Sequence, residues 1–166
     1  MYHDEAAVLN RTATTHIEDE IPFFIPNSEK PVSWHRCLVV DDDPTILRLV
    51  GEMLTELDYH VDMAADGAQA LLALSSHHYD LVLSDLDMPI LSGYHLALSV
   101  KKKNRNIKVV IMTGHCQHEL ADMMGAGPVD AWLFKPFAMS ALSKVLDSLE
   151  LPTSAWHTVS STAMQL

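Results

Sequence analysis

The sequence predicts an α/β domain built on a doubly wound parallel sheet. Four short apolar runs each end in a reactive polar residue, and helix-like runs alternate with strand-like runs across residues 35–151. Runs of this length, bounded by turn residues, are typical of buried parallel strands, and open α/β sheets bind ligands beyond the carboxyl ends of their strands. The pattern therefore predicts one site at one edge of the sheet. The four junctions are Val40 with Asp41-Asp42-Asp43, Leu83 with Asp85, Met112 with Thr113, and Phe134 with Lys135.

Start signals mark the elements in the first half of the domain. After the first strand, Asp43 is placed to cap a helix, with Pro44 in its first turn. Apolar residues then recur at helical spacing up to Leu57, and residues 60–64 predict an edge strand. The Asp66-Gly67 pair predicts a turn into a second helix.

The second half continues the alternation of strands and helices. Its predicted elements are a central strand at Tyr79–Asp85, a loop at Leu86–Gly93, a helix ending at Lys101-Lys102-Lys103, a strand at Ile107–Thr113, a helix over about Gln117–Met124, a strand at Ala131–Lys135 and a last helix at Met139–Leu149. Together, the elements form five βα units. We expect the sheet order 2-1-3-4-5, one of two common doubly wound arrangements.

Residues 1–34 and 152–166 lack the periodicity of the central domain. The first segment contains three prolines and the acidic cluster Glu18-Asp19-Glu20, so we expect an extended or disordered leader. Its apolar patch, Ile21–Pro26, is interpreted either as a docking peptide for a partner or as a segment that lies against the domain or stays mobile. Pro152 ends the last helix, and the second segment is expected to be a flexible tail, too short and too polar for an output domain.

Composition narrows the class of protein. The 166 residues are 48% hydrophobic, which is enough for the core of one ordinary domain. A net charge of −11 opposes binding to nucleic acid or anionic lipid, since both are polyanions. No apolar stretch approaches the ~18 residues of a membrane span, and the chain start lacks the basic region of a secretory signal, so we expect a cytoplasmic protein. Cys37 and Cys116 fall at opposite edges of the predicted sheet and are expected to be free thiols.

The predicted strand order brings polar residues from four strands to one edge. The ends of strands one, three, four and five become consecutive neighbours, spaced ~4.8 Å apart. Converging carboxylates repel one another and attract a hard cation that prefers oxygen ligands. Three acids, a hydroxyl and an amine together predict a centre for a divalent cation and a phosphoryl group. These residues are Asp41, Asp42, Asp85, Thr113 and Lys135.

The same stretches resemble the receiver domain of two-component response regulators, a flavodoxin-like (βα)5 sandwich. The matching stretches are Val39–Asp43, Asp85–Pro89 with Gly93, Met112–Gly114 and Phe134–Phe137, within residues 36–150. Each stretch alone is a weak signal, whereas all of them in this order and at this spacing are specific. The resemblance implies a stand-alone receiver rather than a conventional enzyme, with phosphorylation and dephosphorylation that it catalyses on itself.

The resemblance also implies a role for each site residue. Asp85 is the expected phosphoacceptor. Asp41, Asp42, Asp85 itself and the backbone carbonyl of Asp87 are expected around Mg²⁺, or Mn²⁺ in its place. Phosphoryl transfer depends mainly on positioning and charge stabilisation, for which Lys135 supplies a second fixed positive charge.

A switch is implied as well, because phosphorylation adds about −1.5 to −2 charges and three acceptor oxygens. By the resemblance, the Thr113 hydroxyl moves toward the phosphoryl group and vacates space for an aromatic residue of the fifth strand. Here that residue is Trp132. Its indole is larger than the usual Tyr or Phe side chain, so the resemblance does not decide whether it rotates inward. Gly114 leaves room beside the phosphoryl group, and His115 and Asp87 occupy positions that tune the access of hydrolytic water.

The resemblance finally implies partners and leaves two alternatives. The expected donor is a sensor histidine kinase or a phosphotransfer protein, and a downstream protein target is expected on the fourth helix, the fifth strand and the fifth helix. No nucleic-acid or membrane partner is expected. The Asp85-Leu86-Asp87 stretch also resembles the nucleophile and acid of haloacid-dehalogenase-like phosphohydrolases, although such an enzyme would carry its paired aspartates on the first strand. The other alternative is a receiver-like scaffold that acts without phosphorylation.

Overall fold

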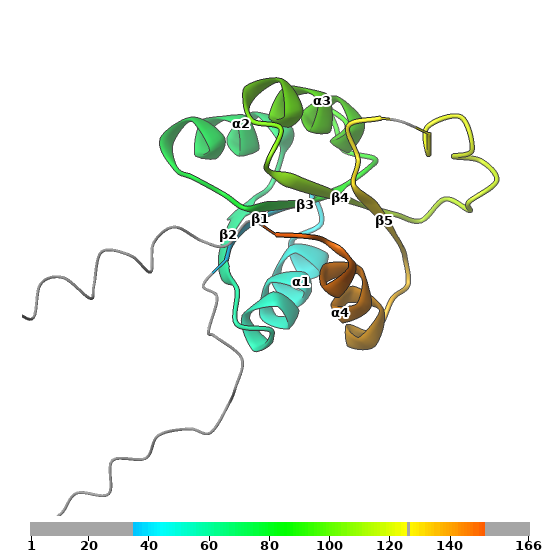
Figure 1. Cartoon of the computed structure of the whole chain (residues 1–166), viewed down its shortest axis with the longest axis horizontal. Helices are drawn as coiled ribbons and strands as arrows, with labels where there is room; N and C mark the ends of the chain where they lie inside the picture. The colour runs from blue at the N-terminus through cyan, green and yellow to red at the C-terminus, as the bar shows by residue number, and fades with distance from the viewer. Residues whose placement is uncertain (1–34, 126, 152–166) are drawn as a thin grey trace, which may run out of the picture. The chain divides into compact units, whose positions relative to one another are not determined.

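A five-stranded parallel sheet forms the centre of the domain (Figure 1). The computed structural model describes residues 35–125 and 127–151. The strands follow the order β2-β1-β3-β4-β5, so the predicted doubly wound arrangement is confirmed. The strands are β1 Arg36–Val40, β2 His60–Ala64, β3 Leu81–Asp85, β4 Lys108–Thr113 and β5 Ala131–Phe134. The helices of the described residues are α1 Pro44–Glu56, α2 Gly67–Ser76, α3 Gly93–Lys103 and α4 Met139–Ser148.

Helices cover both faces of the sheet (Figure 1): α1 and α4 lie on one face, and α2 and α3 on the other. Successive residues of a strand point to opposite faces, so each strand contributes to both cores. In β1, Val39 packs with the α1 and α4 side, whereas Leu38 and Val40 pack with the α2 and α3 side. Burial on both faces explains why the strands are continuous apolar runs.

Side-chain caps fix where the helices begin. Asp43 accepts hydrogen bonds from the backbone N–H groups of Thr45 and Ile46, and Pro44 lies in the first turn, so the predicted start of α1 is confirmed. The second helix begins at Gly67, directly after the predicted turn, and Asp66 caps it by accepting a hydrogen bond from Gln69 N. Such a cap satisfies backbone donors that would otherwise lack a partner at the helix start. The cap of α1 also holds the loop that carries the first acidic cluster.

The helix predicted at about Gln117–Met124 is absent, and this prediction is wrong. Residues 117–123 form consecutive turns, so the described residues contain four helices rather than five. Short helices gain most of their stability from a packed apolar face. Between Gly114 and Gly125, only Leu120 is buried. The surface predicted on a fourth helix is therefore a turn segment.

The two cysteines lie at different depths in the domain. Cys37 is buried and Cys116 is exposed, and both are free cysteines, as predicted. Burial raises the pKa of the Cys37 thiol.

No helix in the described part of the chain is long and apolar enough to cross a membrane. The predictions for the leader at residues 1–34, with its patch Ile21–Pro26, and for the tail at residues 152–166 lie outside the described residues.

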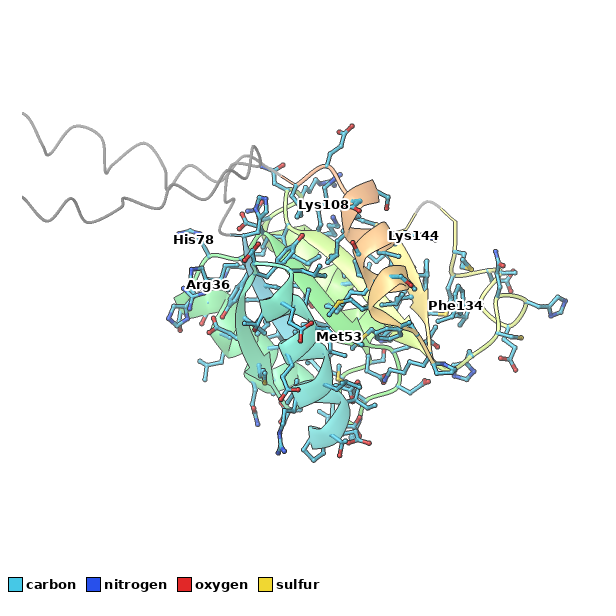
Figure 2. The ribbon with its side chains drawn as sticks, turned by 90° about the horizontal axis from the view of Figure 1, so that it is seen from below. Arg36, Met53, His78, Lys108, Phe134 and Lys144 are labelled. Carbon is cyan, nitrogen blue, oxygen red and sulfur yellow. The ribbon has the colours of Figure 1, made fainter. Side chains whose placement is uncertain are left out.

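A polar cluster ties the amino ends of β1 and β2 to the segment before β3. Arg36 Nε donates to Asp62 Oδ2 (2.9 Å), and the Tyr79 hydroxyl donates to the same oxygen (2.7 Å). Burial raises the pKa of Tyr79, and the hydrogen bond to Asp62 raises it further, to about 12. Arg36 and His78, both labelled in Figure 2, also line a pocket of about 660 Å³. This pocket lies at the amino ends of the strands, away from the predicted site.

The raised pKa of Tyr79 predicts a loss of stability at alkaline pH. Because the pKa rises from 10.0 to about 12 on folding, the contribution of Tyr79 is complete below pH 10 and declines as the pH rises toward 12. Tyr79→Phe is expected to remove part of the decline in the free energy of unfolding, and Tyr59, whose pKa burial also raises to about 12, accounts for another part. Urea unfolding at neutral pH and between pH 10 and 12 measures this decline, with Tyr94→Phe as the control. Equal declines in the wild type and Tyr79→Phe would contradict the assignment.

Candidate functional site

Three charged side chains meet at the carboxyl ends of β1, β3 and β5. Asp41 follows β1, Asp85 ends β3, and Lys135 follows β5. Lys135 Nζ lies 2.8 Å from Asp41 Oδ2 and 2.6 Å from Asp85 Oδ1, so one ammonium bridges both carboxylates. β4 lies between β3 and β5 in the sheet, and the long lysine side chain spans the end of that strand. The predicted meeting of these three residues is therefore present in the structure.

The second oxygen of each buried carboxylate is held by the backbone. Asp43 N donates to Asp41 Oδ1 (2.9 Å), and Asp87 N donates to Asp85 Oδ2 (2.7 Å). A buried carboxylate requires hydrogen bonds or a charge partner, and Asp41 and Asp85 have both. These bonds fix the orientation of the two side chains. Asp42, predicted in the same cluster, is exposed.

The two carboxylates keep Lys135 charged. Partial burial alone would lower the pKa of the ammonium, but the hydrogen bonds and charges of Asp41 and Asp85 outweigh burial and hold the pKa above its ordinary value. Two carboxylates face one ammonium, so the edge carries a net negative charge. Such a charge favours the arrival of a cation.

The oxygen atoms at this edge fit Mg²⁺. This ion is usually bound through one or two carboxylates and keeps several of its waters. Each carboxylate oxygen has more than one lone pair, so the hydrogen bonds of Asp41 and Asp85 leave capacity for a cation. No three His, Cys, Asp or Glu side chains in residues 35–125 and 127–151 are grouped closely enough to hold a metal ion. The arrangement thus matches the sparse protein ligation of Mg²⁺ and differs from a closed zinc cage.

Thr113 ends β4, the strand between β3 and β5. Its side chain is fully buried, and its Oγ1 accepts a hydrogen bond from His115 N (3.0 Å). Lys135 N donates to the Thr113 carbonyl oxygen (2.7 Å), which joins the ends of β4 and β5. Gly114 follows directly, and no heavy atom beyond the adjacent residues Thr113 and His115 lies within 4 Å of the position that its Cβ would take. The predicted hydroxyl and the predicted open space therefore adjoin the charged cluster.

Trp132 lies on β5 and contributes to the core on the α2 and α3 side. It is partly buried there together with Phe134, two residues further along the strand, whereas Leu133 is buried on the opposite face. In the sheet register, Trp132 is paired with Ile111, two residues before Thr113. The aromatic residue is therefore on the strand next to Thr113, and its role in a switch stays a prediction.

A polar bridge links the loops that follow β3 and β4. His115 Nε2 lies 2.8 Å from Asp87 Oδ2, and His115 Nδ1 lies 3.4 Å from Glu119 Oε2. Glu119 Oε2 also accepts a hydrogen bond from Cys116 N (2.9 Å), which with His115 holds the pKa of Glu119 below its ordinary value. Asp87 and His115 are each predicted from the sequence to tune the access of water, but they are not predicted to contact each other. Their pairing carries no sequence signal, because it depends on two loops that meet only at the sheet edge.

Comparisons with known proteins find one family. The sequence profile described as the response regulator receiver domain matches residues 37–147. The chain is 32% identical to the sensor histidine kinase RcsC of Escherichia coli (strain K12) over 148 residues, covering 87% of this chain and 16% of that protein. This chain therefore spans about a sixth of the length of that relative.

Solved structures have the same fold. The response regulator TrrA of Thermotoga maritima, in complex with Mg²⁺-BeF, has a TM-score of 0.62 at 34% identity, covering 68% of this chain and 96% of that one. The receiver domain of the sensor histidine kinase PA1611 from Pseudomonas aeruginosa PAO1 has a TM-score of 0.62 at 27% identity, covering 69% of this chain and 95% of that one. The PA1611 structure contains a magnesium ion coordinated in the active site cleft.

Proposed function

The chain belongs to the response regulator receiver domain family, and on that basis we propose that it is a phosphoacceptor of a two-component system. Asp85 accepts a phosphoryl group from a phosphohistidine on a sensor histidine kinase or a phosphotransfer protein. The observation that best supports this role is the Lys135 bridge, which holds Asp85 at the end of β3 beside a second buried carboxylate, Asp41. Phosphoryl transfer depends on such positioning and charge stabilisation.

The oxygen ligands at this edge are assigned to Mg²⁺, or to Mn²⁺ in its place. Asp41, Asp85 and the backbone carbonyl of Asp87 would hold the ion at this edge, and the exposed Asp42 would turn toward them when the ion binds. When bound, the ion neutralises charge on the oxygens of the incoming phosphoryl group. Magnesium in the related structures of TrrA and PA1611 supports this assignment.

The residues around Asp85 orient its carboxylate for transfer. Asp87 N holds Oδ2, and Lys135 Nζ holds Oδ1. One carboxylate oxygen forms a bond to phosphorus while the N–P bond of the donor phosphohistidine breaks, and the electron pair of that bond returns to the imidazole. Lys135 then remains as a fixed positive charge beside the transferred group.

Phosphorylation changes the hydrogen bonding of Thr113. The phosphoryl group brings about −1.5 to −2 charges. The Thr113 hydroxyl, which accepts from His115 N, also has a proton that it donates to a phosphoryl oxygen. Trp132 on the neighbouring strand responds to that movement, and Gly114 and His115 control access to the phosphoryl group.

The output surface comprises β5, α4 and the turn segment at residues 115–125, which stands where a fourth helix was predicted. Its partner is a protein target rather than nucleic acid, because the chain carries a net charge of −11. A sensor histidine kinase that phosphorylates itself with ATP does so in the cytoplasm. We therefore propose that this chain acts there as well. The haloacid-dehalogenase-like alternative is not retained, since residues 37–147 match a different family.

Asp85→Asn is the direct test of the phosphoacceptor. Incubation of the wild type with acetyl phosphate and Mg²⁺ is expected to add the mass of one phosphoryl group, and Asp85→Asn is expected to add none, because an amide oxygen is a poor nucleophile. Asp122→Asn changes an exposed aspartate outside the site and serves as the matched control. Equal modification of Asp85→Asn and the wild type would place the acceptor elsewhere. A scaffold that acts without phosphorylation would keep its cellular activity in Asp85→Asn.

A further inference from the structure

The loop between β3 and α3 contains a backbone conformation that is unusual for its residue. Ile90 has a φ of 70°, and the N–H of Leu91 donates across it to the carbonyl oxygen of Pro89 (2.7 Å). These two features define the strained form of the γ-turn. A positive φ suits glycine or asparagine, whereas a β-branched residue is strained there. Ile90 therefore lowers the stability of the folded state relative to an asparagine at the same position.

Packing within the described domain does not compensate for this strain. The Ile90 side chain is 95% exposed, and no other large apolar side chain in the described residues is more than 69% exposed. Its neighbours are anchored, since Met88 is buried and Leu91 lies against Gly67 at the start of α2. Strained backbone that is held in place by its surroundings is concentrated at active sites and ligand contacts. The combination of strain and exposure therefore indicates a contact outside the domain.

The same loop is anchored to the proposed phosphoacceptor at both ends. Asp87 N donates to Asp85 Oδ2 (2.7 Å), and Gly93 N donates to the carbonyl oxygen of Leu86 (3.0 Å). Gly93 also lies directly against the backbone of Asp85. Ile90 is thus the tip of a short loop whose base is built around Asp85. A protein that presents a phosphoryl group to Asp85 approaches beside this tip.

We propose that Ile90 is an apolar contact for the protein that donates the phosphoryl group. This inference rests on the proposed function and adds to it the chemistry of the partner, which has an apolar patch next to its phosphohistidine. Burial of Ile90 in that patch removes apolar surface from water and stabilises the complex. A small phosphodonor makes no such contact, so Ile90 favours transfer from the protein donor alone.

Transfer rates with two kinds of donor test this contact. The protein donor is chosen by autophosphorylating the sensor kinases of the source organism with ATP and taking the one that labels the wild-type chain fastest. The small donor is acetyl phosphate with Mg²⁺. Ile90→Asn removes the apolar side chain and relieves the strain, and Ile90→Met keeps an apolar side chain without the β-branch. Leu72→Asn removes an exposed leucine on α2 and is the matched control.

Ile90→Asn is expected to slow transfer from the kinase about tenfold, to keep the wild-type rate with acetyl phosphate, and to raise Tm by roughly 3–6 °C. Ile90→Met and Leu72→Asn are expected to keep the wild-type rates with both donors. Three results for Ile90→Asn would overturn the contact. They are transfer of the phosphoryl group from the kinase at the wild-type rate, loss of transfer from both donors, and a Tm below that of the wild type. The contact is also overturned if acetyl phosphate modifies the wild type and no kinase labels it. A wild type that acetyl phosphate does not modify overturns the proposed function instead.

Discussion

Gly93→Ala is expected to destabilise the domain by about 3 kcal/mol and to disrupt the site around Asp85. Gly93 is the first residue of α3, and its Cα lies against the backbone of β3. A Cβ at this position would overlap the carbonyl oxygen of Asp85 and approach Ser84 Oγ to 3.0 Å. The obstructing atom belongs to the backbone of a central strand in a close-packed core, so it has no free space to move into. Either α3 or the end of β3 must shift, and Asp85 shifts with it.

Two other glycines provide matched controls for this substitution. No heavy atom beyond the two adjacent residues lies within 4 Å of a Cβ at Gly114, so Gly114→Ala should keep the free energy of unfolding within about 0.5 kcal/mol of the wild type. A Cβ at Gly51 would meet the flexible end of the Met63 side chain, so Gly51→Ala should lose less than Gly93→Ala. Urea unfolding measures all three variants, and labelling by acetyl phosphate measures the site in Gly93→Ala. Wild-type stability and labelling in Gly93→Ala would mean that α3 is not held against β3.

The sheet and the charged edge are predictable from the sequence because both follow from patterns at the scale of whole strands. Buried parallel strands are continuous apolar runs, and each run here ends in a polar residue that the sheet order carries to one edge. The apolar runs and the sheet order are sufficient to predict that Asp41, Asp85 and Lys135 lie together. The presence of Gly93 in a family motif is also visible in the sequence. Its contact with the backbone of Asp85 is not, since that contact depends on how closely α3 approaches β3.

Other features depend on packing that residue spacing does not determine. Residues 117–124 have a spacing compatible with a helix, but only Leu120 is buried, and a short helix without a packed face is marginal. The pairing of Asp87 with His115 joins two loops that are far apart in the sequence. Ile90 is an ordinary apolar residue in the sequence, and its positive φ arises from the closure of the loop in the folded chain. These differences concern the loops, where few local signals constrain the backbone.

Lys135→Met is expected to cost about 2 kcal/mol of stability in the absence of Mg²⁺. The substitution removes the ammonium that bridges Asp41 and Asp85 and leaves two carboxylates without a charge partner. The Asp41 side chain is only 2% exposed, so water replaces the lost interaction poorly. The expected cost lies below the roughly 3–5 kcal/mol of a fully buried pair, because the Lys135 side chain itself is 24% exposed.

Mg²⁺ should recover much of this loss. An ion that binds the folded state and not the unfolded chain stabilises the protein by mass action, and here it also supplies the positive charge that Lys135→Met lacks. Urea unfolding without and with millimolar MgCl₂ should therefore show that Mg²⁺ raises the free energy of unfolding more in Lys135→Met than in the wild type. Lys144→Met is the matched control, because Lys144 is an exposed lysine on α4 (Figure 2) and its loss should leave the gain at the wild-type value.

A double-mutant cycle with Asp41→Asn separates the charge of Lys135 from its packing. If the lysine acts by compensating Asp41, the double variant should lose less stability than the sum of the two single variants, with a coupling energy of about 1–2 kcal/mol. Purely additive losses, together with an equal gain from Mg²⁺ in all variants, would mean that Lys135 contributes through packing alone. Coupling in the cycle and a larger increase in the free energy of unfolding with Mg²⁺ would both follow from the negative charge of Asp41 and Asp85. The folded edge carries more negative charge than one lysine neutralises, so we expect it to bind a cation before a phosphoryl group arrives.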